Sequence, residues 1–265
     1  MKRNYLKSCI IALFTALTFA LFAFPLRPAY TAGAESQTLS SYTTYFSTTD
    51  VGRSRNIALA SALIDGVTLQ AYGEFSFNQT VGRRTKEDGF KDAKIIVNGE
   101  YAVGTGGGVC QVSTTLYNSA LKSGLTVTEF HPHSLQVSYV APSRDAMVST
   151  QSDLKLYNPY PFAVKINVKV KDGSIRASFS SEAGKRTGYR YEIVSETLEE
   201  VPPPPPIVKL GETEAILRSP KNGLKSQAYL ETYKGESLVS RTRLRVDSYL
   251  PIQGVIVKKI DNTSN

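Results

Sequence analysis

The sequence has little cysteine and little histidine, with two residues of each type among 265. Cys9 lies in an apolar N-terminal run, so Cys110 is the only thiol of the remaining chain. A disulfide scaffold is therefore excluded, and so is a zinc site built from several cysteines. In an exported protein, an unpaired cysteine is a candidate reactive thiol. The interpretation of Cys110 thus depends on whether the chain is exported.

The N-terminus has the pattern of a secretory signal peptide. Three basic residues among the first seven precede the apolar run Cys9 to Phe24, and Ala32-Gly33-Ala34 gives an A-x-A cleavage pattern. The run is shorter than the roughly 20 residues of a spanning helix, and an uncleaved anchor is the alternative. We expect residues 1–34 to be a signal peptide, the protein to be secreted, and membrane contact only through an uncleaved signal segment.

The chain also lacks a block of lysine and arginine, although its net charge is +8. Cleavage after Ala34 removes four basic residues and no acidic one, which leaves +4. Such a protein is poorly matched to nucleic acid, but it suits anionic envelope polymers through salt-screened attraction. A glycine cluster at residues 104–108 lacks the Lys-Ser/Thr of a nucleotide phosphate loop. We therefore expect no nucleic-acid partner and no cofactor.

A run of five prolines, Pro202 to Pro206, marks a boundary in the chain. Such a run forms a stiff polyproline segment, so residues 201–207 are predicted to be a linker. Residues 35–200 are predicted to form an α+β domain with mainly antiparallel strands and a few helices. Residues 208–265 are predicted to form a small all-β module without helices.

Hydrophobic periodicity and turn residues place the elements of the first domain. Apolar residues at helical spacing predict helices over Asn56 to Ile64 and over Val109 to Lys122. Asn98-Gly99 and Asp172-Gly173, each between strand-like runs, predict two β-hairpins. A further strand is predicted over Leu135 to Val140. The charged stretch Arg83 to Phe90 is expected to be a solvated loop, and a loop that holds a substrate is the alternative.

Cys110 lies at the start of the second predicted helix, directly after the glycine cluster. There, unpaired N–H groups and the positive end of the helix dipole lower the pKa of a thiol. The backbone N–H groups of Cys110 and Gln111 are candidate oxyanion donors. Gly106, Gly107 and Gly108 would let a substrate approach without meeting a Cβ atom. The alternative is that Cys110 packs into the core, as free cysteines often do.

Both histidines lie in the stretch EFHPHS. His131 and His133 flank a proline in extended backbone, which should point both imidazoles the same way. One of them is the candidate base for Cys110, oriented by Asp145, and Arg144 is a candidate contact for a substrate carboxylate. Two alternatives stay open: a zinc site of both histidines with Cys110 or Asp145, and a purely structural pair. The preferred site contains no metal.

The stretch from Tyr72 to Leu156 resembles the VanW-like family, and a weaker similarity continues to Ser180. The motifs GEFSFN, GGGVCQVSTTLYN, HPHS and RDA stand in the family's order and approximate spacing. The resemblance implies a bacterial envelope protein linked to peptidoglycan, and it is no evidence of vancomycin resistance. Residues 208–265 resemble the five-glycine domain of cell-surface proteins, which implies association with wall sugars.

The residues and the resemblance together predict a protein at the cell wall or the extracytoplasmic face of a bacterial envelope. The leading hypothesis is a Cys110-dependent acyl hydrolase or transferase that acts on peptidoglycan stem peptides. In this hypothesis His133 or His131 is the base and Asp145 orients it. The first alternative is a non-catalytic protein that binds peptidoglycan or another cell-wall polymer. The second is a zinc-binding site.

Overall fold

The computed structural model describes residues 36–97, 99–182, 185 and 187–259, all within one compact unit of residues 35–265. The predicted signal peptide lies outside the described residues. Within these residues, no helix has both the length and the apolar character needed to span a membrane. The fold is α+β, and most strand pairs are antiparallel, as predicted from the sequence.

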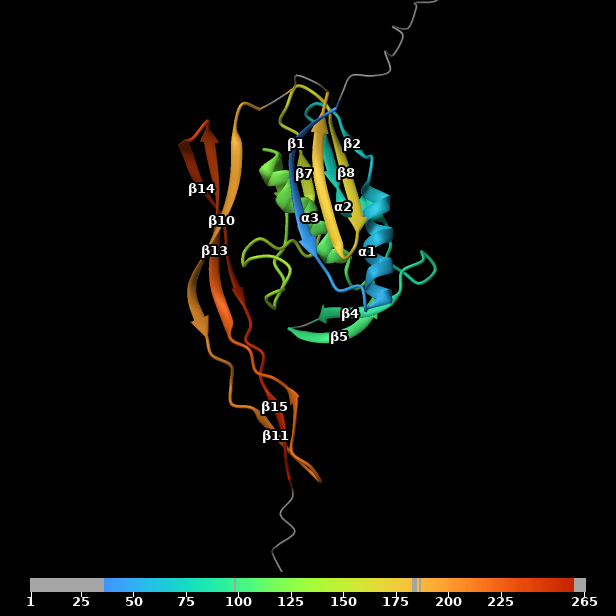
Figure 1. The fold of residues 1–265 in the computed structure, drawn as a ribbon, viewed down its shortest axis with the longest axis vertical. Coiled ribbons are helices and arrows are strands. Elements are labelled where there is room, and N and C mark those ends of the chain that lie inside the picture. Colours follow the sequence, from blue (N-terminus) through green and yellow to red (C-terminus); the bar gives the residue numbers. More distant parts are fainter. Residues whose placement is uncertain (1–35, 98, 183–184, 186, 260–265) are drawn as a thin grey trace, which may run out of the picture. The chain divides into compact units, whose positions relative to one another are not determined.

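A four-stranded antiparallel sheet carries the helices (Figure 1). Its strand order is β1 (Gln37–Tyr45), β9 (Ser174–Ser181), β8 (Val164–Lys171) and β2 (Thr68–Leu69). Strands β8 and β9 form the hairpin predicted at Asp172-Gly173, and both turn residues have positive φ, at 47° and 72°. These angles fit a type I′ turn, which matches the twist of the flanking strands. Alternate residues of both strands, such as Ile166 and Phe179, are fully buried beneath the helices.

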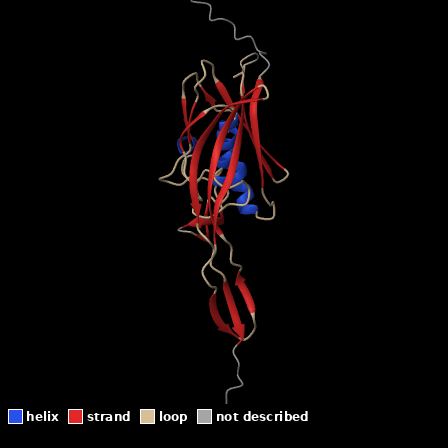
Figure 2. Cartoon of the chain, turned by 90° about the vertical axis from the view of Figure 1, so that its left-hand side faces the viewer, coloured by secondary structure: helices blue, strands red, loops and turns tan. Residues whose placement is uncertain are grey.

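The described residues contain three helices: α1 (Val51–Ile64), α2 (Phe77–Val81) and α3 (Val109–Lys122). Helix α3 has the predicted bounds, whereas α1 begins at Val51 rather than Asn56. The earlier start follows from Asp50, whose carboxylate accepts a hydrogen bond from the backbone of Arg53 (2.9 Å) and so caps the helix. Helix α3 packs against β1 and β9 on one side and against β10 (Arg190–Val201) on the other, so strands flank it (Figure 2).

Two smaller sheets complete the first part of the chain. Strands β4 (Asp92–Val97) and β5 (Glu100–Thr105) form the hairpin predicted around Asn98-Gly99. A three-stranded sheet has the order β3 (Glu74–Ser76), β7 (Lys155–Tyr157) and β6 (Thr126–Glu129). The hairpin β4–β5 lies next to the glycine cluster that leads into α3.

Residues 130–154 contain no helix or strand, so the strand predicted over Leu135 to Val140 is wrong. Leu135 and Val137 are both buried, which produces the alternation of apolar residues. The backbone between them pairs with no strand. Alternation reports which side chains are buried, and here it marks a loop anchored by alternate side chains.

The strands that follow the prolines belong to two further sheets, and the described residues after Pro206 contain no helix, as predicted. The first is antiparallel, with the order β10, β13 (Gly223–Lys234) and β14 (Ser237–Tyr249). Because β10 precedes the prolines and β13 follows them, this sheet joins residues from both sides of the predicted linker. The division of the chain into two domains at residues 201–207 stays a prediction, and the two predicted domains share this sheet.

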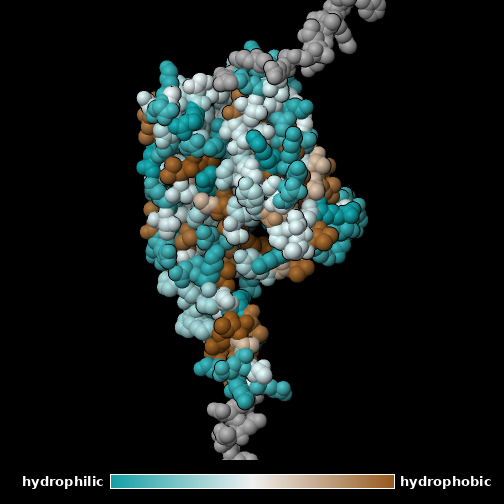
Figure 3. All heavy atoms as spheres, viewed as in Figure 1, coloured by the Kyte–Doolittle hydropathy of each residue, from teal (hydrophilic) through white to brown (hydrophobic). Residues whose placement is uncertain are grey.

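The second sheet is small and mixed, with the order β11 (Ile207–Gly211), β15 (Val255–Lys259) and β12 (Ala215–Arg218). Several of its large apolar side chains are exposed, and hydrophobic residues are visible on its surface in Figure 3. The most exposed are Leu210 and Ile216.

We predict that Asn56→Ala lowers the free energy of unfolding by about 2–4 kcal/mol. The buried Asn56 amide donates to the carbonyls of Lys91 (2.8 Å) and Gly107 (2.9 Å) and accepts from the Lys91 N–H (2.7 Å). Alanine leaves these backbone groups unpaired. Urea denaturation measures the change, with Asn222→Ala, which removes an exposed amide contact, as the control. Equal stability of the two variants would contradict the prediction.

Candidate functional site

Cys110 is the second residue of α3, at the end of a tight glycine turn. The N-cap residue Gly108 has φ 107°, a left-handed conformation that favours glycine. The N–H groups of Val109 and Gln111 are bonded to the carbonyls of Gly106 (3.1 Å) and Gly108 (3.0 Å). Within the described residues, the Cys110 N–H donates to no protein acceptor. Of the two predicted oxyanion donors, Cys110 therefore keeps its N–H available and Gln111 does not.

The glycines before Cys110 have a packing role. A Cβ atom on the buried Gly107 would lie 2.6 Å from the carbonyl oxygen of Lys94. A Cβ atom on Gly108 would lie 3.0 Å from side-chain atoms of Arg53 and Ile57. Gly106, Gly107 and Gly108 also line the cavity in front of Cys110. The close approach of other residues of this chain thus explains why Gly107 and Gly108 lack a side chain. The role of the three glycines in substrate binding remains a prediction.

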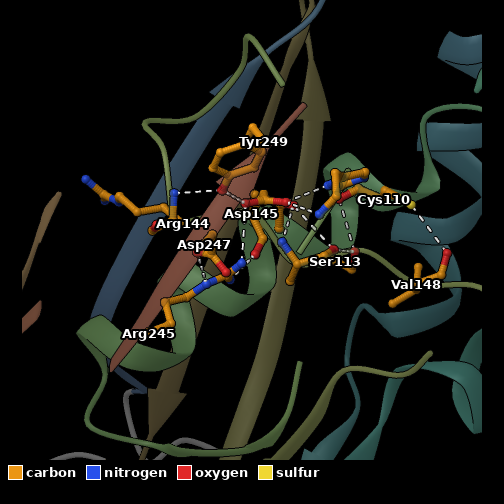
Figure 4. Close-up of polar contacts among 12 residues, drawn as sticks. Cys110, Ser113, Arg144, Asp145, Val148, Arg245, Asp247 and Tyr249 are labelled. Carbon is orange, nitrogen blue, oxygen red and sulfur yellow. Dashed lines mark hydrogen bonds and ion pairs between the residues drawn. The ribbon is translucent and has the colours of Figure 1, made fainter. Parts of the chain in front are cut away.

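Cys110, His133 and Asp145 lie together. The His133 Nδ1 atom is 2.7 Å from Asp145 Oδ2, and the same oxygen accepts the backbone N–H of His133 at 2.7 Å. The His133 imidazole is close enough to the Cys110 thiol to lower the pKa of that thiol, and both residues line the same cavity. The Cys110 sulfur lies 3.4 Å from the carbonyl oxygen of Val148 (Figure 4). Because Nδ1 is held by the carboxylate, Nε2 is the nitrogen left to serve the thiol. In chemical terms, such an arrangement can supply a nucleophile, a base and an orienting carboxylate.

Cys110, His133 and Asp145 shift one another's pKa values toward the charged forms. Burial raises the pKa of the Cys110 thiol, but the His133 imidazole and the Arg84 guanidinium outweigh burial and lower it. Burial lowers the pKa of His133, but Asp145 and Cys110 raise it to about 9. Burial raises the pKa of Asp145, whereas His133 and Arg245 lower it below the usual value. All three shifts favour the charged forms, which are a thiolate, an imidazolium and a carboxylate.

His131 lies in a different environment, contrary to the expectation that both imidazoles face the same way. Its Nε2 is 3.0 Å from Glu129 Oε1, its side chain is 38% exposed, and it does not line the Cys110 cavity. The described residues contain no group of three or more His, Cys, Asp or Glu side chains placed to hold a metal ion. The zinc site of Cys110, His131 and His133 is therefore not assembled.

A cavity of about 1100 Å³ opens in front of Cys110. Cys110 is half-buried in its wall rather than sealed in the core, and His133 lines the same cavity. Arg84 and Tyr139 also line it and lie near the thiol. Sequence reasoning missed Tyr139. Arg84 belongs to the charged stretch Arg83 to Phe90, for which substrate binding is only the alternative to a solvated loop.

Two other predicted contacts have internal partners. The Gln111 side chain accepts from Arg53 (2.6 Å) and donates to the backbone of Tyr45 (2.9 Å), so it ties α3 to α1 and β1. Arg144 donates to Asn118 (3.0 Å) on α3 and does not line the cavity. Gln111 therefore reaches the cavity wall only as part of an internal network, and Arg144 is separated from the cavity.

Comparison with known proteins gives one family match, which lies in the first domain. Residues 52–180 match the family described as VanW like protein, and this confirms the resemblance seen from Tyr72 onward. The uncharacterized protein YoaR of Bacillus subtilis (strain 168) is 37% identical over 171 residues, which cover 64% of this chain and 54% of the relative. The vancomycin B-type resistance protein VanW of Enterococcus faecalis (strain ATCC 700802 / V583) is 27% identical over 127 residues, which cover 45% and 46%. The chain spans about half the length of these curated relatives.

Among the solved structures that match this chain, two cover about a quarter of it. One is titled "IgA1 Protease G5 domain structure", with 17% identity, a TM-score of 0.19, and coverage of 27% of this chain and 87% of that one. The other is titled "Crystal structure of HP0197-G5", with 15% identity, a TM-score of 0.16, and coverage of 26% and 93%. Both titles name a G5 domain, the five-glycine type that residues 208–265 resemble in sequence.

We predict that Cys110 reacts with iodoacetamide as a thiolate well below pH 8.5, the approximate titration midpoint of a free thiol. Because His133 stabilises the thiolate, His133→Ala should move the midpoint of the labelling rate upward by about one pH unit or more. His131→Ala should leave the midpoint unchanged and is the matched control. The measurement uses residues 35–265, in which Cys110 is the only cysteine. Labelling only after unfolding would show that Cys110 is an inert core residue.

Proposed function

We propose that this protein, whose residues 52–180 belong to the VanW-like family, is secreted and works on peptidoglycan in the bacterial cell envelope. The family match, the exported N-terminal pattern and the weakly basic mature chain support this location. The name of the vancomycin resistance relative also belongs to envelope biology, but the resistance is a property of that relative. Residues 208–265 would hold the wall and raise the effective concentration of the site near its substrate.

Within that role, we propose that the protein is a Cys110-dependent acyl hydrolase or transferase on stem peptides. The observation that carries the proposal is the Cys110–His133–Asp145 arrangement at the wall of a large cavity. The thiolate attacks the carbonyl carbon of a peptide bond, and the Cys110 N–H stabilises the oxyanion that forms. As the C–N bond breaks, the His133 imidazolium gives its proton to the leaving amine. Water or a second amine then attacks the thioester, gives its proton to His133, and releases the acyl product and Cys110.

The charge of the cavity favours substrates that carry carboxylates. Its charged lining residues, apart from His133, are Arg53, Arg83, Arg84 and Lys94 against Asp50. Arg84 donates to Asn78 through one nitrogen, while its buried Nε has no partner among the described residues. A guanidinium with a free donor suits a carboxylate. Arg84 therefore replaces Arg144 as the proposed contact for a stem-peptide carboxylate.

The second proposal is a non-catalytic protein that binds peptidoglycan in the same cavity. The size of the cavity and its basic lining support binding equally well. The two proposals differ in the role of the thiol, because binding alone requires no nucleophile.

We expect Cys110→Ala to lower product formation from purified peptidoglycan by at least about 10³-fold while leaving sedimentation with insoluble peptidoglycan unchanged. Mass spectrometry of the released or cross-linked fragments measures the reaction. His131→Ala, which changes the other histidine, should retain activity. Wild-type protein that binds peptidoglycan but changes no bond in it would favour the binding proposal.

We expect Arg84→Gln to raise KM for carboxylate-bearing peptidoglycan fragments by about tenfold or more, because a charge-assisted contact is lost. Arg144→Gln, outside the cavity, should leave KM unchanged. The same fragments with amidated carboxylates provide the second comparison. If amidation weakens the wild type and Arg84→Gln to the same extent, Arg84 does not contact the carboxylate.

A further inference from the structure

The inner face of β14 ends at the candidate site. The buried residues of this strand are Arg245, Asp247 and Tyr249, which follow one another at alternate positions on one face. A strand that served only to pack would bury apolar residues there. Instead, the three buried side chains are polar, and two of them contact Asp145.

The contacts to Asp145 are divided between its two carboxylate oxygens (Figure 4). Oδ2 faces His133, as described above. Oδ1 accepts the hydroxyl of Tyr249 at 2.5 Å and lies 3.6 Å from Nη2 of Arg245. Arg245 also donates to the backbone carbonyl of Asp145 at 2.6 Å. Oδ2 of Asp145 thus contacts the imidazole, and Oδ1 contacts side chains of β14.

Arg245 and Tyr249 are themselves fixed in these positions. Asp247 accepts from Arg245 Nε at 2.6 Å, which sets the orientation of the guanidinium. The Tyr249 oxygen accepts the backbone N–H of Ser143 at 2.8 Å and so has one hydrogen left to donate to Asp145. Burial and the adjacent carboxylate raise the pKa of Tyr249, which keeps that hydrogen in place.

The loop that carries Asp145 is joined to the sheet at further points. The Ser143 hydroxyl is 2.7 Å from the hydroxyl of Ser226 on β13. The backbone N–H of Leu250 donates to the carbonyl of Ser134, next to His133, at 2.8 Å. Both ends of the pair His133–Asp145 therefore rest on strands that follow the proline run.

We infer that Tyr249 and Arg245 are positioning residues of the Cys110 site, so that the segment after the prolines takes part in its chemistry. They hold the Asp145 carboxylate with Oδ2 aimed at His133 Nδ1, which in turn presents Nε2 to the thiol. The inference rests on the proposed function of Cys110. It extends that function by making β14 a part of the active site as well as of a wall-binding module.

The reactivity of Cys110 reports this positioning, provided that the other nearby charges are held constant. The groups that face Asp145 and Cys110 from the packed elements are His133, Arg245, Tyr249, Tyr117, Tyr139 and Arg84. Removing the Tyr249 hydroxyl changes one donor and leaves these charges in place. Phenylalanine also preserves the ring that is buried there.

The test is the pH profile of iodoacetamide labelling at Cys110 in Tyr249→Phe. We expect the midpoint to rise by about half to one pH unit, because a less well held Asp145 stabilises the His133 imidazolium less. On peptidoglycan fragments, kcat should fall about tenfold with little change in KM. Tyr233→Phe is the matched control, since Tyr233 on β13 also donates its hydroxyl to a carboxylate, that of Glu231, at 2.6 Å.

A second mutation separates positioning from a structural role. If Tyr249 acts through Asp145, Tyr249→Phe should have no further effect on the midpoint in an Asp145→Asn background.

Arg245→Lys should shift the midpoint less than Arg245→Met, because lysine retains the charge. A Tyr249→Phe variant with lower stability but an unchanged midpoint would overturn the inference. The inference would also be overturned if Tyr249→Phe shifted the labelling midpoint as much in the Asp145→Asn background as in the wild type.

The labelling measurement needs no substrate, so the inference and the proposed function fail in different ways. Wild-type protein with a low midpoint, a Tyr249-dependent shift and no turnover would contradict the acyl-transfer proposal and support the positioning of Asp145. Turnover that depends on Cys110 but not on Tyr249 or Arg245 would support the proposed function and overturn the inference.

Discussion

The ionised carboxylate of Asp145 is the group on which the organisation of the site depends. It is 99% buried, and a buried charge is costly unless several partners compensate for it. His133 comes from the same loop as Asp145, whereas Arg245 and Tyr249 come from the distant strand β14. The loop of residues 130–154 contains no helix or strand, so its backbone is not fixed by strand pairing. The contacts of Asp145 help to fix its path. Electrostatic contacts thus add to the packing of buried apolar residues, such as Leu135 and Ala146, in holding this loop.

A second set of constraints places the thiol against this carboxylate and imidazole. The turn before α3 requires glycine, because Gly107 lies against the backbone of β4 and Gly108 adopts a left-handed conformation. Asn56 on α1 binds the carbonyl of Gly107, and Gln111 links α3 to α1 and β1. Helix α3 therefore begins at a fixed position. Its first turn carries Cys110 to the cavity wall with its N–H free.

The sequence predicted those features that depend on local patterns. The bounds of α3, the hairpins at Asn98-Gly99 and Asp172-Gly173, and the absence of helices after the prolines follow from periodicity and turn residues. The scarcity of cysteine and histidine predicted that Cys110 and a histidine share one site, and Cys110 and His133 line the same cavity. The choice of His133 over His131 did not, because it depends on a loop whose path is set by tertiary contacts.

Other parts of the site had no local signal. Arg84 lies in a charged stretch that resembles any solvated loop, and only the fold brings it to the cavity. Arg245 and Tyr249 are separated from Asp145 by about a hundred residues, and alternating polar residues on a strand usually face solvent.

The burial of these charges bears on the choice between catalysis and binding. Binding a wall polymer requires a cavity of suitable shape and basic groups that line it, and the cavity has these in Arg53, Arg84 and Lys94. It gains nothing from a buried carboxylate that raises the pKa of His133 to about 9, or from a thiol whose pKa is lowered. Apolar residues of similar volume would stabilise the same fold at least as well. Natural proteins retain such costly arrangements mainly where chemistry uses them, and a nucleophile with its base and orienting carboxylate is the chemistry that these residues can perform.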